Sequence, residues 1–234
     1  MIEAFEYDVG AECIHAWGMT EMSPLGTVAR IKNSMTGAAP SETIQYRVKQ
    51  GRPVYGVDMK IAGDGGKPLD HDGEAFGELC VRGPWITGGY FEDDDADKGA
   101  FDDDGYLRTG DVSTIDAEGF MQIVDRAKDV IKSGGEWISS IELENLAVGH
   151  ADVAEAAVIG IEHDKWGERP LLVIVPAKGK APAPDDILAL FDGKVAKMCI
   201  PDAVEFVDEL PHTATGKILK TKLREDFKGY SLPG

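Results

Sequence analysis

The stretch from residue 104 to residue 142 carries a carboxylate, several cations and flexible backbone in close succession. A Thr-Gly-Asp segment at 109–111, which we expect to form a turn, ends its first part. Its second part holds Arg126, Lys128 and Lys132 ahead of a glycine pair. A carboxylate accepts hydrogen bonds from a diol, cations neutralise phosphate, and glycine allows close approach of a second backbone. The combination is suited to binding a ribose and a phosphate.

Each of these pieces also has a purely structural interpretation. A Thr-Gly-Asp turn is more often a loop than a site, and lysines four residues apart usually lie on a solvated face. The order of the groups is what favours a binding site. Two further motifs in the chain point in the same direction.

The first motif is HAWGMTEMSPLGT, from 15 to 27. Gly18 permits a turn that presents Thr20 and Glu21 side by side. A hydroxyl can donate to a phosphate oxygen, and a carboxylate can bind Mg²⁺, which usually takes one or two carboxylates together with substrate phosphates. The alternative is a loop in which Thr20 caps a helix, and the residues alone leave both interpretations open.

The second motif is LPHTATGKILKTKLRE, from 210 to 225. We expect Thr213, Thr215 and Gly216 to form a loop that presents Lys217. Three more basic residues follow on an expected helix, where they can equally form an ordinary basic surface.

Composition limits the range of functions. The chain has 234 residues, of which 43% are hydrophobic, enough to bury a core in one or two domains. The net charge of −18 argues against nucleic acid or an anionic membrane surface as the main partner. Residues 1–125 carry −14 and residues 126–234 only −4, so the second part is the better host for polyanions.

Neither a disulfide framework nor a zinc site is indicated, because the three cysteines lie far apart without a paired spacing. No stretch approaches the ~20 apolar residues of a membrane span. The first residues lack the basic and apolar regions of a signal peptide. We therefore expect a cytoplasmic protein without stable membrane insertion.

Residue patterns also predict secondary structure. Strands are expected at 54–61, from 77 onward, at 153–161, at 170–177 and at 203–207, and a helix at 185–197. Ser139 and Glu142 fit a capping box at the start of another helix. In the second part, strands and helices alternate over about a hundred residues, the size of a separate small α+β domain.

Taken together, the motifs resemble those of the adenylate-forming superfamily of acyl-CoA synthetases, luciferases and peptide-synthetase adenylation domains. WGMTE resembles the aromatic-Gly-x-Thr-Glu motif, and Pro211 to Lys217 matches the terminal Pro-x-x-x-x-Gly-Lys signature. GPWITGGY and DRAKDVIKSGGEWISS bring the resemblance closest to bacterial medium- and long-chain fatty-acyl-CoA synthetases. The motifs follow the family order over nearly the whole chain.

The resemblance implies an α+β fold in two parts. Residues 1–126 would form the β-rich, distorted-barrel portion of a large N-terminal domain. Residues 127–234 would form the small, mobile α+β C-terminal domain. Lys128 falls at the hinge position, where many family members carry Asp.

The resemblance also implies site residues. Nucleotide contacts fall on Trp17, Gly18, Thr20, Asp111, Arg126, Lys132 and Trp137. Trp17 would lie beside adenine, where the family more often has Tyr, and Asp111 would accept hydrogen bonds from both ribose hydroxyls. Thr20, on the adenylate phosphate, and Glu21, the Mg²⁺ ligand, are implied to be catalytic. For Trp137, a role as a core or interdomain aromatic is an equal alternative.

Two further sites complete the implied machinery. Lys217 would be catalytic, bridging the acyl carboxylate and the α-phosphate. Ser133, Gly134 and Gly135 would contact CoA, with the glycines lining the pantetheine tunnel. Both sites lie in the second part of the chain.

The implied reaction uses ATP, CoA and a fatty or other carboxylic acid. Acid and ATP give acyl-AMP and pyrophosphate, and the CoA thiol then displaces AMP. The family's phosphate loop is not found before Trp17, and most of the acyl pocket is also expected upstream. We therefore expect the C-terminal part of a synthetase, inactive alone. A homodimer of the whole enzyme is left open, and the acyl chain is not indicated.

Two other classes of function stay open. An adenylation domain or ligase that loads a carrier protein would share every motif except the contacts to CoA. A non-catalytic nucleotide-binding module would share the fold without turnover.

Overall fold

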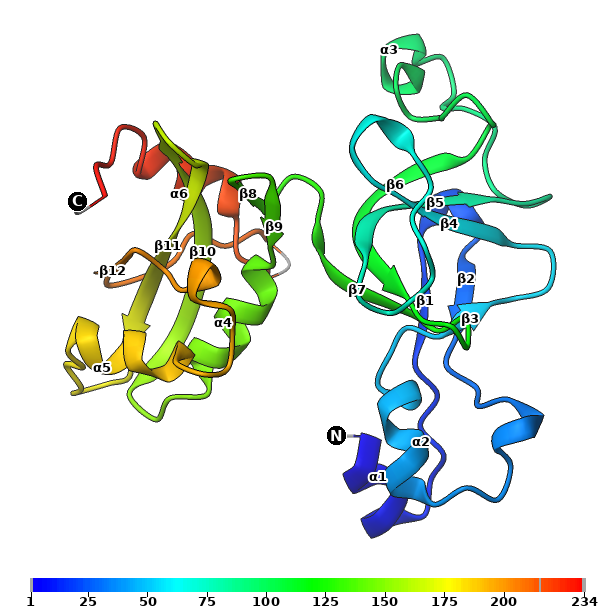
Figure 1. Cartoon of the computed structure of the whole chain (residues 1–234), viewed down its shortest axis with the longest axis horizontal. Coiled ribbons are helices and arrows are strands. Elements are labelled where there is room, and N and C mark those ends of the chain that lie inside the picture. The colour runs from blue at the N-terminus through cyan, green and yellow to red at the C-terminus, as the bar shows by residue number, and fades with distance from the viewer. Residues whose placement is uncertain (1, 215, 233–234) are drawn as a thin grey trace. The chain divides into compact units, whose positions relative to one another are not determined.

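The computed structural model describes residues 2–214 and 216–232. The chain divides into two compact units, Met1–Ala127 and Lys128–Gly234 (Figure 1). Each contains helices and one or more β-sheets, so the mixed α and β class predicted from the sequence is confirmed. None of the helices in the described part of the chain is both long and apolar enough to cross a membrane.

Unit 1 contains two antiparallel sheets. Its elements are α1 (Ile2–Val9), β1 (Ala16–Gly18), η1 (Thr20–Met22), β2 (Leu25–Val28), η2 (Asn33–Met35), α2 (Pro40–Arg47), β3 (Arg52–Pro53), β4 (Asp58–Ala62), η3 (Asp64–Gly66), β5 (Phe76–Arg82), α3 (Asp94–Asp97), β6 (Leu107–Ile115) and β7 (Met121–Arg126). The strand orders are β1-β2-β3 and β4-β5-β6-β7. Over the described residues neither sheet closes into a barrel.

The core of unit 1 lies on one face of the four-stranded sheet. Strand β4 covers only the second half of the strand predicted at 54–61, and β5 begins one residue before the strand predicted from 77. Met59 and Ile61 of β4 alternate with more exposed residues, as one-sided packing requires, whereas β5 buries Leu79, Cys80 and Val81 in succession. The buried cluster consists of Met22, Val57, Met59, Ile61, Leu79, Val81, Leu107, Ile115 and Met121. Trp17 packs against this cluster, which connects β1 to the larger sheet.

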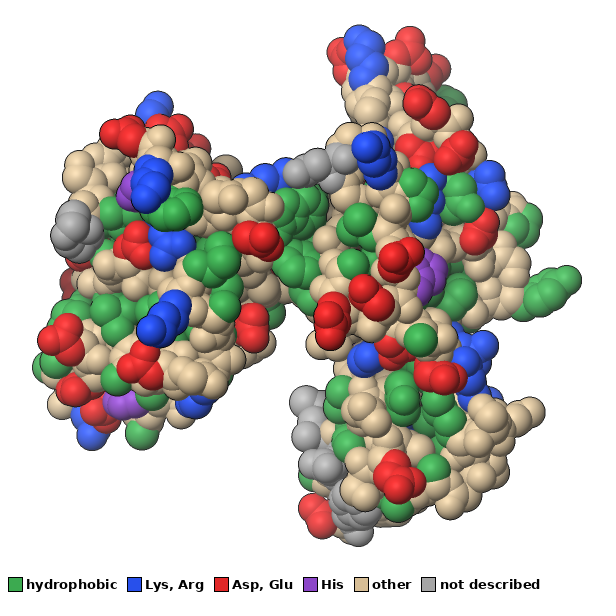
Figure 2. All heavy atoms as spheres, viewed as in Figure 1, with side chains coloured by type: hydrophobic (Ala, Val, Ile, Leu, Met, Phe, Trp, Pro, Cys, Tyr) green, Lys and Arg blue, Asp and Glu red, His purple; other side chains and the backbone are tan. Residues whose placement is uncertain are grey.

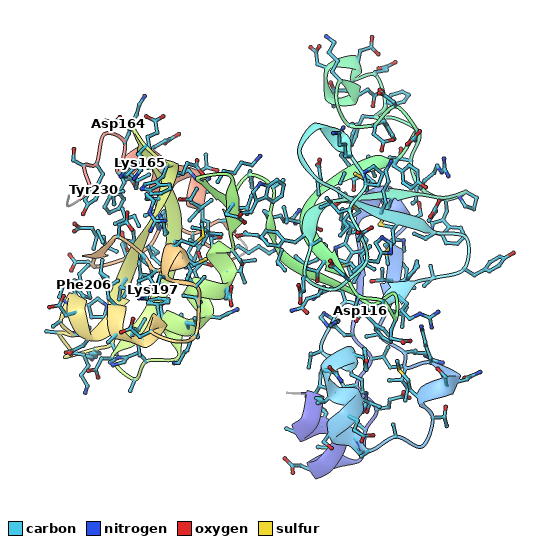
Figure 3. All side chains as sticks on the ribbon, in the orientation of Figure 1. Asp116, Asp164, Lys165, Lys197, Phe206 and Tyr230 are labelled. Carbon is cyan, nitrogen blue, oxygen red and sulfur yellow. The ribbon has the colours of Figure 1, made fainter. Side chains whose placement is uncertain are left out.

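Asp116, labelled in Figure 3, fixes the turn between β6 and β7. Its Oδ1 atom accepts the backbone N–H groups of Glu118 and Phe120, both at 2.9 Å. These bonds hold the turn next to the Ile115–Met121 pair. The register shifts once between Val112 and Ser113, and beyond that shift Asp111 lies directly opposite Arg126.

The expected turn at 109–111 is wrong, because these residues lie inside strand β6. The register between β5 and β6 sets the three residues from Thr109 to Asp111 against Leu79 alone, which is a bulge. Gly110 has a φ of +71°, a conformation that favours glycine. Bulges bend a strand and re-aim its side chains, and here the redirected side chain is that of Asp111.

Unit 2 is built on one mixed sheet. Its elements are β8 (Ile131–Ser133), β9 (Glu136–Ile138), α4 (Ser140–Val148), β10 (Val153–His163), β11 (Gly167–Pro176), α5 (Pro184–Leu188), η4 (Ala189–Phe191), η5 (Lys197–Cys199), β12 (Ala203–Phe206) and α6 (Lys220–Asp226). The strand order is β10-β11-β8-β9, with β12 parallel to β11.

The long β10–β11 hairpin is buried on both faces, as its apolar sequence predicts. One face carries Val158, Leu172 and Ile174 and packs with residues of α4 and α5. The opposite face carries Ile159 and Leu171 and packs with residues that include one from α6. Alternate side chains of a strand point to opposite faces, so a continuous apolar run supplies two cores.

Helix starts were predicted better than helix ends. Ser139 caps α4, and its hydroxyl accepts the backbone N–H of Glu142 at 3.1 Å. The helix predicted at 185–197 is shorter, however: α5 and η4 end at Phe191. Asp192 is already non-helical, and Gly193 follows with a φ of +71°, which does not continue a helix.

The acidic residues around α3 form an exposed surface. Asp and Glu side chains gather over this helix in Figure 2. Water and dissolved counter-ions ordinarily surround such a cluster.

Arg169 is the most extensively bonded charged side chain in unit 2 that we describe. It is 8% exposed, and its guanidinium donates to both carboxylate oxygens of Asp202, at 2.9 and 2.5 Å. It also donates to the carbonyl oxygens of Met198 (2.5 Å) and Ile200 (3.2 Å). The remaining bond is to Ser133 Oγ at 3.2 Å. Arg169 thus joins β11, β8 and the segment before β12.

We predict that Arg169→Ala destabilises the chain by roughly 3–5 kcal/mol, because it leaves a carboxylate and two carbonyl groups without their donor. Urea unfolding measures this loss. Arg82→Ala is the matched control, because Arg82 and Asp58 form a pair in which both side chains are about half exposed (51% and 58%). Removal of that pair should cost less than about 1 kcal/mol. Equal losses in the two variants would contradict the assigned importance of Arg169.

Candidate functional site

Strand β1 and the turn after it position the first motif. Gly18 is required by close packing, since a Cβ atom there would lie 1.8 Å from the carbonyl oxygen of Pro24. The chain then forms the short helix η1, in which Met22 is fully buried and Thr20 is exposed. The buried methionine anchors the turn, so Thr20 and Glu21 are presented from a fixed backbone.

Three residues from separate parts of unit 1 meet at one carboxylate. Trp17 Nε1 donates a 3.0 Å hydrogen bond to Asp111 Oδ2. Arg126 Nη1 lies 2.8 Å from Asp111 Oδ1. Asp111 is only 4% exposed, whereas Trp17 is half-buried and Arg126 is exposed. The structure therefore brings together three of the residues predicted to contact a nucleotide.

The Asp111 carboxylate is in an electrostatically unfavourable place. Burial raises its pKa above the ordinary value, and the opposing effects of Arg126 and Trp17 do not fully compensate. Its backbone N–H donates to Thr109 Oγ1 at 3.1 Å. A charge kept in such a position at the expense of stability is a common property of binding sites.

Thr20 and Glu21 line a cavity of about 370 Å³. Glu21 is half-buried, and residues of the GPWITGGY motif, including Thr87 and Tyr90, line the same cavity. Thr20 and Glu21, adjacent in the first motif, therefore line one cavity. The cavity is also wide enough to admit a small polar group.

Tyr90 is a site residue that the sequence analysis did not assign. Its hydroxyl donates a 3.0 Å hydrogen bond to Glu21 Oε1, and the Thr87 N–H donates to the Glu21 carbonyl at 2.8 Å. Burial, and secondly the bond to Glu21, raise the pKa of the Tyr90 phenol, which keeps it a donor at neutral pH. The family-like segment marked this region, but no periodicity predicts its contact with Glu21.

In unit 2, the turn between β8 and β9 is fastened to the β10–β11 hairpin. The Gly134 N–H donates to the Trp166 carbonyl at 2.7 Å, and a Cβ atom on Gly134 would lie 2.8 Å from the indole of Trp166. Ser133 is buried and accepts a bond from Arg169. Gly135 has a φ of +90° and open space where a Cβ would lie. The turn is thus rigid on one side and accessible on the other.

Lys132 and Trp137 pair across β8 and β9. The Lys132 ammonium lies 4.8 Å from the centroid of the Trp137 ring, within the range of a cation–π contact. The two residues predicted as nucleotide contacts in unit 2 are therefore neighbours. The turn at Gly134–Gly135 joins their two strands.

Lys128 is the first residue of unit 2, and its side chain is exposed. Its carbonyl accepts a 2.9 Å hydrogen bond from Arg224 of α6, which also pairs with Asp129 at 2.5 Å. The backbone at the boundary of the units is therefore tied to the last helix of unit 2.

Lys217 lies on a short loop and is exposed. Its N–H donates to Thr213 Oγ1 at 3.1 Å, and its carbonyl accepts the Thr213 N–H at 2.7 Å. Thr215, expected in the same loop, lies outside the described residues. Lys220, the next lysine after Lys217, forms a 2.6 Å ion pair with Glu144 of α4. The loop that presents Lys217 is thus anchored at its far end.

Unit 1 has a carboxylate at a strand bulge and a Thr-Glu pair on a cavity, and unit 2 has a terminal lysine loop. Each of these features is typical of adenylate-forming enzymes. The family model described as AMP-binding enzyme matches residues 1–91. The model described as AMP-binding enzyme C-terminal domain matches residues 142–217. The chain belongs to the AMP-binding enzyme family.

Named relatives agree with this assignment. The chain is 53% identical to 3-methylmercaptopropionyl-CoA ligase of Ruegeria lacuscaerulensis, covering 97% of the chain and 42% of the relative. It is 48% identical to medium-chain-fatty-acid–CoA ligase of Ectopseudomonas oleovorans, covering 97% of the chain and 41% of that relative. The chain therefore spans about two fifths of the length of these relatives.

The fold is also that of a solved member. The structure of ATP-bound MatB from Rhodopseudomonas palustris matches with a TM-score of 0.77 and 31% identity, over 97% of this chain and 43% of that one. The similarity extends over nearly all of the chain, so it covers elements of both units.

We predict that Asp111→Asn stabilises the chain at neutral pH. A carboxyl with a raised folded pKa favours folding only while it is protonated, and this contribution is lost as the pH rises through the folded pKa. The advantage of the neutral amide should therefore shrink as the pH falls toward about 3.9, the ordinary value for Asp. Thermal unfolding between pH 4 and pH 7 measures it, with exposed Asp70→Asn as the control for net charge. A variant that is less stable, increasingly so at higher pH, would show that the Arg126 pair outweighs burial.

Proposed function

We propose that this chain supplies the ribose-binding, metal-binding, terminal-lysine and CoA-contacting parts of an AMP-forming acid–CoA ligase. The observation that carries the proposal is the Asp111 carboxylate, buried at a strand bulge and bonded to Trp17 and Arg126. Such a group has little structural value, because its burial is unfavourable. It is suited to accept hydrogen bonds from a vicinal diol.

The proposed reaction has two steps. A carboxylate oxygen of the acid attacks the α-phosphorus of ATP, the bond to the β-phosphate oxygen breaks, and pyrophosphate leaves. The sulfur of CoA, after loss of its proton, then attacks the acyl carbon, and the bond to AMP breaks. The nucleophile and the leaving group of each step are anionic, so the chain's contribution is to position these groups and to compensate their charge.

Nucleotide contacts are assigned to both units. In unit 1 the indole of Trp17, with Gly18, would lie beside adenine, and Thr20 would donate to the phosphate. In unit 2 the Lys132–Trp137 pair offers a cation and an aromatic face, which suits a nucleotide in the same way. We assign these roles because the positions match motifs of the family.

Glu21 is the proposed Mg²⁺ ligand, and its surroundings fit that role. Its described partner is the neutral hydroxyl of Tyr90, which orients a carboxylate without neutralising it. Among the described residues no cluster of three or more metal-ligating side chains occurs. That agrees with Mg²⁺, which is commonly held by few carboxylates and by substrate phosphates. When bound, Mg²⁺ would withdraw charge from those phosphates.

Lys217 and the Ser133–Gly135 turn are proposed to act in different steps. An exposed ammonium on an anchored loop can reduce the repulsion between the acid's carboxylate and the α-phosphate. An accessible glycine backbone lets the narrow pantetheine chain approach closely. Lys128, at the boundary of the units, is the proposed hinge that separates the steps.

The substrate class is proposed from the relatives. Their names give 3-methylmercaptopropionyl and medium-chain fatty acyl groups. Both are aliphatic, so we propose that the whole enzyme activates a fatty or other aliphatic carboxylic acid.

We predict that the chain alone does not complete the reaction, because its sequence holds no Ser/Thr/Gly-rich phosphate loop before Trp17. Given ATP, CoA, Mg²⁺ and a series of aliphatic acids, the purified 234-residue chain should release no pyrophosphate above the blank. Sustained release of pyrophosphate would overturn this part of the proposal.

In an active enzyme that includes these residues, Lys217→Ala should slow acyl-AMP formation by on the order of 10², the scale for one well-placed electrostatic group. Preformed acyl-AMP should still react with CoA at a near-normal rate. Measurement of each half-reaction separately tests this, and equal losses in both steps would contradict the assignment of Lys217 to the first.

Gly135→Leu should do the reverse and slow only the transfer to CoA, because its side chain would fill the open space beside the turn. Gly135→Ala is the matched control, since it carries the same strain at a φ of +90° without the bulk. Similar losses in both glycine variants would indicate backbone strain rather than obstruction. Substitution of a phosphopantetheinyl carrier protein for CoA in the same assay separates a CoA ligase from a carrier-loading enzyme.

A further inference from the structure

We propose that Trp17 is a positioning residue for Asp111, and that its indole N–H, as well as its aromatic face, sets the selectivity of the site for ribose. This inference rests on the proposed function and goes beyond the role of Trp17 as a surface beside adenine. It starts from the 3.0 Å hydrogen bond that joins two residues 94 positions apart in sequence.

The backbone and packing around Trp17 leave its indole little freedom. Trp17 pairs with Thr27 across β1 and β2, and its ring packs against the core cluster of unit 1. A Cβ atom on Gly26 would lie 2.8 Å from the Trp17 ring and 2.5 Å from Met22 Cε. The indole therefore rests close to the glycine backbone, and its N–H points at Asp111 from a fixed position.

The two donors divide the carboxylate between them. Trp17 donates to Oδ2, and Arg126 approaches Oδ1. Each carboxylate oxygen can accept about two hydrogen bonds. Each oxygen therefore keeps acceptor capacity for one ribose hydroxyl, while rotation of the Asp111 carboxylate is restricted from both sides.

Trp17 is the more restrictive of the two donors. The Arg126 side chain is 55% exposed, against 6% for that of Asp111. Water competes for an exposed guanidinium, and long flexible side chains lose entropy when they are fixed, so exposed ion pairs hold geometry weakly. The indole is rigid and packed, and its donor is neutral. It can thus orient the carboxylate without removing the charge that strengthens a bond from a ribose hydroxyl.

The proposal separates two properties of the same side chain. Phenylalanine keeps an aromatic face but has no N–H, so Trp17→Phe should preserve contact with a base and release the carboxylate. Alanine removes both. A merely structural tryptophan would show no link between its N–H and discrimination at the ribose.

The first test needs no ligand. In a ¹H–¹⁵N spectrum of the full chain, the Trp17 indole resonance is assigned by its loss in Trp17→Phe. In Asp111→Ala its proton should move upfield, because the acceptor is gone, while the indole signals of Trp85 and Trp166 keep their positions as internal controls. An unchanged Trp17 resonance would overturn the positioning role.

The second test compares AMP with 2′,3′-dideoxy-AMP by calorimetric titration of the full chain. Unsubstituted protein should prefer AMP, and Trp17→Phe should reduce the ratio of the two affinities by about tenfold, the scale of a hydrogen bond to a charged group. Its affinity for the dideoxy nucleotide should hardly change, whereas Trp17→Ala should lose affinity for both. An unaltered ratio in Trp17→Phe would contradict the proposal.

The two tests distinguish the possible failures. If the unsubstituted chain binds neither nucleotide, the proposed nucleotide site is wrong and the ribose selectivity falls with it. The spectrum still decides in that case whether Trp17 orients Asp111. If AMP binds and Asp111→Ala leaves the indole unmoved, the nucleotide site stands and the role of Trp17 is rejected.

Discussion

The site in unit 1 depends on keeping one buried carboxylate charged and correctly aimed. Asp111 is almost completely removed from water, and burial raises its pKa in spite of two donors. The surrounding structure supplies what this requires: a bulge in β6 directs the side chain, the β6–β7 register places Arg126 opposite, and β1 brings Trp17. An unfavourable buried charge held by three separate elements is characteristic of a binding group rather than a structural one.

Unit 2 holds its candidate residues in place differently from unit 1. Lys217 and the Gly134–Gly135 pair lie on a loop and a turn, and charged side chains that are buried or half-buried fasten these segments to the sheet and helices. Arg169 connects β11 to Ser133 at the glycine turn, and Lys220 ties the base of the terminal lysine loop to α4. Buried charged groups are costly unless every bond is made, so these contacts specify one arrangement of the loops.

The sequence predicted the elements that depend on local patterns. Alternation in the second half of 54–61, the apolar runs of β10 and β11 and the Ser139 cap each report a burial or hydrogen-bonding requirement within a few residues. Residues 54–57 were wrongly included in the first of these strands, because they form a turn before β4. The strand bulge at 109–111 was missed, because a Thr-Gly-Asp sequence allows a turn as easily as a bulge and only the pairing with β5 decides. The end of the predicted 185–197 helix at Phe191 was missed. A glycine at 193 does not by itself reveal whether a helix bends there or has already ended.

The sequence identified residues of the candidate site but not their arrangement in space. Motif resemblance named Trp17, Asp111 and Arg126, yet their meeting requires two sheets to be packed together, which no local pattern encodes. The bond from Tyr90 to Glu21 spans 69 positions and is of the same kind. Contacts between distant segments depend on the tertiary fold, and single-sequence reasoning can identify their members only through a known family.

The central claim is that the Asp111 carboxylate is the ribose-binding group of a nucleotide site. A crystal structure of the chain with AMP tests it most directly. The account predicts that the two ribose hydroxyls lie within hydrogen-bonding distance of the two Asp111 oxygens, with Trp17 Nε1 still bonded to Oδ2. AMP bound with its ribose away from Asp111, or a carboxylate turned from Trp17 toward solvent in the complex, would contradict it.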